Sequence, residues 1–109
     1  MKTVEIPSLK IREALPEDVQ AMTSIAIEIF WREYGSREKA EKAFRDYVAR
    51  RWESLVRRRA GIVLVAEMHG EVVGFLVFRW WFGRNSWLEV IAVKEEHRGK
   101  GIGTRLRKN

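Results

Sequence analysis

The segment from Val90 to Thr104 constrains this chain more than any other. Apolar and β-branched residues at 90–93 predict a strand, and a charged loop follows in which glycine stands at positions 99, 101 and 103. A helix is expected to begin inside this loop, at about residue 101. Glycines at alternate positions expose backbone N–H groups at a helix start without a Cβ in the way of an anion. Arg98 and Lys100 add positive charge, so the segment predicts a phosphate-binding loop.

Three kinds of phosphate loop compete for this segment. A Walker A loop requires a Gly-Lys-Ser/Thr ending, which is missing here. A dinucleotide-binding fingerprint requires a third glycine where Thr104 stands, and an acidic residue about twenty positions later, past the last residue, Asn109. The stretch Arg98-Gly99-Lys100-Gly101-Ile102-Gly103 resembles the acyl-CoA loop of the GNAT N-acetyltransferases, Arg/Gln-x-x-Gly-x-Gly/Ala, at every defined position.

The resemblance to the GNAT superfamily extends over the whole chain and in the same order. Residues 11–18 are similar to its usual opening strand and helix start, and residues 65–75 are similar to its central hairpin. The resemblance and the order of elements imply an α+β fold in which helices flank a mostly antiparallel sheet. We expect one such domain over residues 1–109.

The resemblance also implies a cosubstrate and a reaction. In this family acetyl-CoA lays its pantetheine arm along the strand before the loop, its pyrophosphate rests on the loop amides, and the acetyl group passes directly to an amine. No metal is implied. The acceptor, a protein or a small molecule, is not specified, although Trp31, Arg32 and Tyr34 occupy the segment that lines the acceptor site in relatives. The residues that the resemblance assigns to the cofactor are Ile91, Ala92, Val93, Arg98, Gly99, Lys100, Gly101, Ile102, Gly103 and Thr104.

Glu89 is the candidate general base. It stands two residues before Ile91 on the same strand, so both side chains lie on one face. Many family members use a carboxylate of this strand to take a proton from the amine. The alternative is an ordinary strand glutamate that faces solvent or pairs with Arg79 or Arg84.

The remaining elements follow from periodicity and turn residues. Residues 9–12 alternate as a half-buried strand does, and Pro16 opens a helix with an apolar stripe from Val19 to Phe30. Ser36 is a plausible N-cap for a second helix, which Gly61 should end in the left-handed conformation. Strands are predicted at 62–66, 72–81 and 87–93, with turns at 69–70 and 83–86. The apolar face of the second helix is predicted to be Ala40, Phe44, Tyr47, Val48, Leu55 and Val56, with Trp52 beside it.

Family members continue for a further helix and several strands, often with a tyrosine that protonates the leaving thiolate. We therefore expect this fold to be C-terminally truncated and its last strand to have an unpaired edge. Such an edge favours association with a second copy, most simply as a homodimer. The aromatic cluster Trp80, Trp81, Phe82 and Trp87 is expected in the core, or alternatively as a substrate wall or at that contact.

Composition narrows the remaining classes of protein to which the chain could belong. The chain has no cysteine, which excludes disulfides and thiolate metal sites, and no apolar run long enough for a membrane span. It has neither a secretory signal nor a membrane segment, so a cytoplasmic protein is expected. Scarce glutamine and asparagine lean toward a thermophilic source. The net charge of +6 gathers at residues 50–59 and at the C-terminus. This charge keeps open a second hypothesis, a non-catalytic module that binds CoA or, less favoured, nucleic acid.

Overall fold

The computed structural model describes residues 8–81 and 86–108, with the side chains of residues 80, 81 and 86–88 left aside. The predicted aromatic cluster at Trp80, Trp81, Phe82 and Trp87 lies outside the described side chains. The helices and strands, in chain order, are β1 Leu9–Glu13, α1 Val19–Phe30, α2 Arg37–Ala43, α3 Ala49–Arg58, β2 Ile62–Met68, β3 Glu71–Trp81, β4 Ser86–Val93 and α4 Ile102–Lys108.

The strands form one antiparallel sheet in the order β1-β2-β3-β4. A tight turn joins β2 to β3, and its residues His69 (φ 53°) and Gly70 (φ 79°) both have the positive φ that such a turn requires. The predicted α+β class with an antiparallel sheet is confirmed, and the sheet leaves β4 at one edge.

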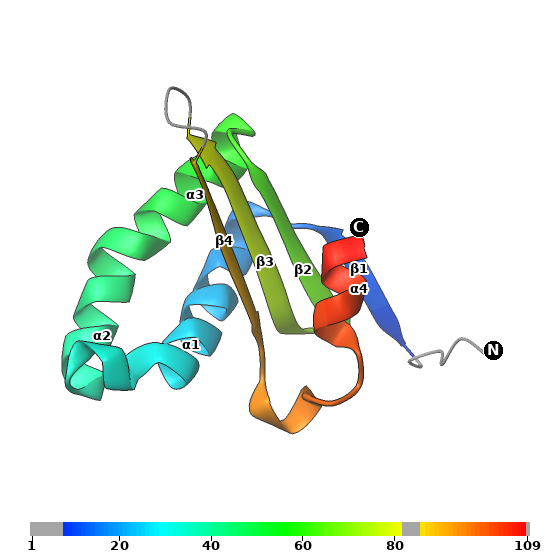
Figure 1. The fold of residues 1–109 in the computed structure, drawn as a ribbon, viewed down its shortest axis with the longest axis horizontal. Coiled ribbons are helices and arrows are strands. Elements are labelled where there is room, and N and C mark those ends of the chain that lie inside the picture. The colour runs from blue at the N-terminus through cyan, green and yellow to red at the C-terminus, as the bar shows by residue number, and fades with distance from the viewer. Residues whose placement is uncertain (1–7, 82–85, 109) are drawn as a thin grey trace.

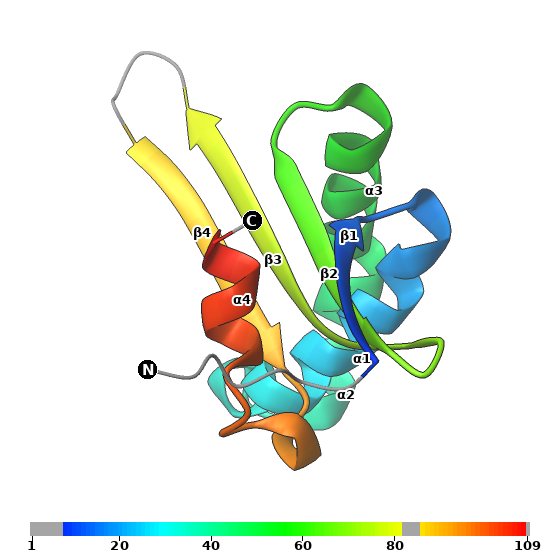
Figure 2. The same ribbon diagram turned by 90° about the vertical axis from the view of Figure 1, so that its right-hand side faces the viewer.

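The helices cover the two faces of the sheet unequally (Figures 1 and 2). Helices α1 and α3 pack on one face and form the larger core with Phe75 and Val77 of β3. Among the described residues, α4 is the helix that packs on the other face, where Ile102 and Leu106, each 1% exposed, contact a smaller apolar cluster. The phosphate-loop segment therefore joins the end of β4 to the second face.

The second predicted helix is interrupted by a wider turn. Ser36 caps its start as predicted, since its Oγ accepts a hydrogen bond from the Lys39 N–H at 3.1 Å. Residues Phe44–Val48 then form a π-helical turn between α2 and α3. The extra residue in this turn rotates the following side chains. Tyr47, predicted in the core, is 72% exposed, and Trp52, predicted beside the buried face, is only 4% exposed.

The end of α3 also differs from its prediction. Arg59, not Gly61, takes the left-handed conformation that ends the helix, with φ 52°. Glycine is required at position 61 for a different reason, because a Cβ there would lie 2.6 Å from the backbone oxygen of Phe78. Gly61 therefore allows the chain entering β2 to pass close to β3.

A charged network fixes the start of α1 to the sheet. Arg12 of β1 donates to both carboxylate oxygens of Asp18, at 2.7 and 3.0 Å, and to Glu67 of β2 at 3.2 Å. Asp18 also accepts the Leu15 N–H at 2.6 Å. These hydrogen bonds, that of Arg12 foremost, lower the pKa of Asp18 below its ordinary value, although burial of the carboxylate opposes them.

Candidate functional site

The free edge of β4 offers backbone groups to a ligand. The Lys94 N–H bonds to Val73 O at 2.8 Å, and the register then pairs Ala92 with Phe75. Hydrogen-bonded pairs alternate along an antiparallel ladder, so the backbone groups of Ile91 and Val93 point away from β3. The Val93 carbonyl indeed accepts a hydrogen bond from Arg98 Nε at 3.2 Å rather than from the sheet. The backbone N–H and C=O of Ile91 and the N–H of Val93 thus face outward, where an added strand could pair with them.

The loop after β4 depends on glycine at two positions for its backbone. Gly99 and Gly101 both have φ 80°, and a Cβ on either would meet nothing within 4 Å. The requirement is therefore conformational and not a matter of local packing. Gly103 is different, because its Cβ would lie 3.8 Å from Cδ1 of Ile91, in ordinary contact.

The start of α4 leaves backbone donors outside the helix ladder. The first helical hydrogen bond runs from the Arg105 N–H to Gly101 O at 3.0 Å. The N–H groups of Ile102, Gly103 and Thr104 precede this bond and have no acceptor within the helix. The side chain of Ile102 is buried beneath the sheet, so only its backbone can meet a ligand.

A groove of about 480 Å³ lies along the free edge of β4. It brings together many of the residues assigned from the sequence, but Gly99, Lys100, Gly101 and Ile102 do not line it. Two lining residues, Ile29 and Phe30, come from α1 and were missed, because they read as members of an ordinary apolar stripe. The groove is lined by Ile29, Phe30, Ile91, Ala92, Val93, Arg98, Gly103, Thr104 and Arg107.

Glu89 lies on the face of β4 that α4 covers. Its Oε1 forms an ion pair with Arg107 Nε, 3.0 Å away, and its side chain is 34% exposed. From the sequence, Arg79 and Arg84 were the expected partners of Glu89; the structure pairs it with Arg107 of α4, and Arg84 lies outside the described residues. Arg107 had been read only as part of a basic tail. Nothing in its local sequence singles it out, because its proximity to Glu89 depends on how α4 packs.

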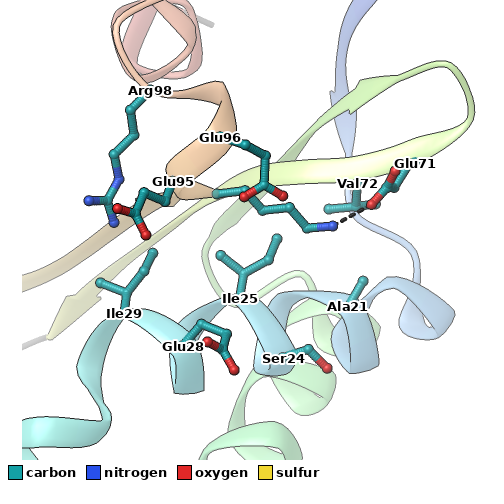
Figure 3. Close-up of a pocket in the computed structure, with 11 residues that line it drawn as sticks. Ala21, Ser24, Ile25, Glu28, Ile29, Glu71, Val72, Glu95, Glu96 and Arg98 are labelled. Carbon is teal, nitrogen blue, oxygen red and sulfur yellow. Dashed lines mark hydrogen bonds and ion pairs between the residues drawn. The ribbon is translucent and has the colours of Figure 1, made fainter.

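A second cavity, of about 600 Å³, adjoins the groove between α1 and the loop (Figure 3). It shares Ile29 and Arg98 with the groove. In Figure 3, Ile25 and Ile29 of α1 point across the cavity toward Glu95 and Glu96 of the loop. At its far side Lys94 pairs with Glu71, and this hydrogen bond lowers the pKa of the Glu71 carboxyl.

The segment expected to line an acceptor site is occupied by contacts of its own. The guanidinium groups of Arg32 and Arg37 lie over the ring of Trp31, 4.9 and 5.1 Å from its centroid. Tyr34 packs on Phe44, with 5.3 Å between ring centroids. Neither cavity described above is lined by Trp31, Arg32 or Tyr34, and their role toward an acceptor stays a prediction.

Residues 8–81 and 86–108 bear on two further classes of site, membrane spans and metal centres. Within these ranges no helix has the length and apolar character of a membrane span. The same residues hold no group of three or more histidine, aspartate or glutamate side chains placed to ligate a metal ion.

Comparison with known proteins places the chain in a family. Residues 24–108 match the model of the acetyltransferase (GNAT) family. The match spans well over half of the chain, and the chain belongs to that family. No protein with a curated description matches the sequence.

Solved structures agree with this fold. PaiA N-acetyltransferase from Thermoplasma acidophilum, in complex with coenzyme A, superposes with a TM-score of 0.74 at 24% identity, over 93% of this chain and 68% of that one. A GCN5-related N-acetyltransferase from Ralstonia eutropha gives 0.72 at 17% identity, over 92% and 71%. A GNAT family acetyltransferase from Brucella melitensis, in complex with acetyl-CoA, gives 0.63 at 22% identity, over 92% and 64%. The chain therefore spans about two thirds of the length of these relatives.

Proposed function

We propose that this chain binds acetyl-CoA along the free edge of β4 and transfers its acetyl group to an amine. The single observation that carries the proposal is the groove, in which the outward-facing edge of β4 ends at the glycine loop and the start of α4. Two solved relatives are complexes with coenzyme A or acetyl-CoA, which supports this choice of ligand.

The charges of the groove match the parts of that ligand. Arg98 and the donors at Gly103 and Thr104 stand at the loop end, where the pyrophosphate would lie. The pantetheine arm would then pair with the backbone N–H and C=O of Ile91 and with the N–H of Val93, as an added strand pairs with the edge of a sheet. The thioester would thus reach the part of β4 that carries Glu89.

The reaction requires a base that takes the proton of the amine and groups that stabilise the oxyanion of the tetrahedral intermediate. The amine nitrogen attacks the thioester carbon, the C–S bond breaks, and the nitrogen loses one proton. We assign that proton to the Glu89 carboxylate, directly or through water. The products are an acetamide and the thiolate of CoA, which takes up a proton to become the thiol. Glu89→Gln should lower kcat roughly a hundredfold and leave the KM for acetyl-CoA nearly unchanged.

Calorimetric titration with acetyl-CoA tests the loop. Gly101→Glu adds a side chain and a negative charge, so its affinity should fall by more than about tenfold, or 1.4 kcal/mol. Gly70→Glu is a matched control, because Gly70 has φ 79° against 80° for Gly101 and equally open surroundings. The control should bind within about twofold of the parent, since only Gly101 belongs to the loop. Equal affinities for the parent and a folded Gly101→Glu variant would refute the assignment of the loop as the pyrophosphate site.

The same edge favours self-association. Backbone groups of Ile91 and Val93 that bind no ligand can pair with a second copy, and a symmetric dimer is the simplest product. Sedimentation at micromolar concentration tests this, with and without acetyl-CoA. Because the ligand would occupy the same groups, it should shift the equilibrium toward the monomer. A monomer under both conditions would show that the edge does not pair.

A further inference from the structure

One residue belongs both to the groove and to the surroundings of Glu89. Arg107 lines the groove along β4. It also lines a neighbouring pocket on the α4 face, together with Glu89, Leu106 and Phe78. Among the residues that line these two cavities, Arg107 is the one they share. A ligand in the groove therefore contacts the side chain that holds Glu89.

The backbone position of Arg107 is fixed by its neighbours on α4. Leu106 and Ile102 are each 1% exposed and pack on the sheet. The guanidinium can consequently approach Glu89 to 3.0 Å from a helix that these two side chains hold against the sheet. The closest approach in the pair is made by Nε, and arginine carries five N–H donors, so one guanidinium can serve both Glu89 and a ligand in the groove.

Stability does not account for this pair. The side chains of Arg107 and Glu89 are 62% and 34% exposed, and exposed pairs of this kind contribute about 0–1 kcal/mol. What the pair does fix is the direction of one carboxylate in the middle of β4, beside which the thioester would lie. A misplacement of about 1 Å in a catalytic group can cost roughly a hundredfold in rate.

We propose that Arg107 is a positioning residue, which orients the Glu89 carboxylate and couples that orientation to occupancy of the cofactor groove. This inference rests on the proposed function. It adds a residue that acts through Glu89 and not by binding the amine. It also predicts that acetyl-CoA in the groove changes the environment of the Glu89 carboxylate through the shared guanidinium.

Steady-state kinetics separate positioning from the other roles. Arg107→Gln should lower kcat roughly ten- to a hundredfold with the KM for acetyl-CoA changed less than about threefold, and Arg107→Lys should recover part of the loss. In a Glu89→Gln background, Arg107→Gln should cost almost nothing more, because the group it orients is already gone. Arg57→Gln is the matched control: Arg57 Nε donates to Glu53 at 2.9 Å and is 61% exposed, and this variant should keep the parent kcat.

The outcomes distinguish this inference from the proposed function. If the parent chain fails to bind acetyl-CoA, the proposed function falls and the inference falls with it. If the parent is active but Arg107→Gln has its kcat, only the inference is overturned. If Arg107→Gln weakens acetyl-CoA binding and its effect adds fully to that of Glu89→Gln, then Arg107 is a cofactor ligand instead. That result would also overturn the inference.

A spectroscopic test works without turnover. The ¹³C carboxyl signal of Glu89 can be assigned by its disappearance in Glu89→Gln. Acetyl-CoA should shift that signal in the parent chain but much less in Arg107→Gln. Equal shifts in both chains would show that the ligand acts on Glu89 directly, contrary to the coupling through Arg107.

Discussion

The two faces of the sheet differ in how completely they are covered. On the face under α1 and α3, an aromatic series runs from Tyr34 through Phe44 and Trp52 to Phe75, with ring centroids 5.1–6.2 Å apart. On the other face, the seven-residue α4 is the only helix in the described part of the chain that packs against the strands. The larger core should therefore supply most of the stability, while the proposed ligand chemistry lies at the β4 edge and the α4 face.

The strongest test of this difference is to remove a ring from the larger core. Phe75 is 0% exposed and contacts Trp52 at 5.1 Å between centroids. Phe75→Ala should lower the free energy of unfolding by about 4 kcal/mol. Tyr47→Ala, on the exposed side of the π-helical turn, should change it by less than about 0.5 kcal/mol. Denaturant unfolding measures both, and similar losses would mean that Tyr47 is packed after all.

The smaller face should respond with a smaller loss of stability but a larger loss of binding. Leu106→Ala removes one of the two side chains that hold α4 to the sheet, at a cost of about 2–3 kcal/mol. Because a short helix is not stable alone, α4 should detach locally before the sheet unfolds. Hydrogen exchange should show faster exchange in α4 than in β2 and β3. A uniform change over both faces would contradict the separation.

The charged network at the start of α1 gives the first face a dependence on pH. The pKa of Asp18 is lowered in the folded state, so its contribution is fully present above its unfolded pKa and is lost as pH falls through the lower, folded value. Asp18→Asn should lower the free energy of unfolding by about 2 kcal/mol at neutral pH. The loss should shrink in acid. A difference between parent and variant that is independent of pH would exclude this origin.

A smaller loss of stability than that of the core variants is expected in the loop. Gly99→Ala places a Cβ at φ 80°, and the strain should cost about 1 kcal/mol, since nothing else lies within 4 Å. When affinity is measured on folded protein, Gly99→Ala should nevertheless lower the affinity for acetyl-CoA more than Phe75→Ala does. Calorimetry beside thermal unfolding checks both quantities. A loop variant that loses stability without affinity would break the proposed division between the faces.

The sequence allowed the element order, the antiparallel sheet and the glycine loop to be predicted, because these depend on periodicity and on backbone conformations that few residues adopt. It did not reveal the π-helical turn, because Tyr47 and Trp52 both fit a helical stripe and only packing against Phe75 decides between them. It also missed Arg107, whose role depends on the contact between two elements. Positive φ at Arg59 could not be foreseen while Gly61 offered an apparently better helix end.

The register of the sheet also sets an order of assembly. Strands β2, β3 and β4 follow one another in the chain and pair as neighbours, whereas β1 must close a long loop to place Leu9 opposite Met68. Closing that loop costs more chain entropy, so the three consecutive strands should form first and β1 should dock late. Apart from Ile29 and Phe30 of α1, the groove is lined by β4, the loop and α4, and α4 lies against the early strands. The ligand-binding edge should thus take shape in the folding chain before its N-terminal strand is in place.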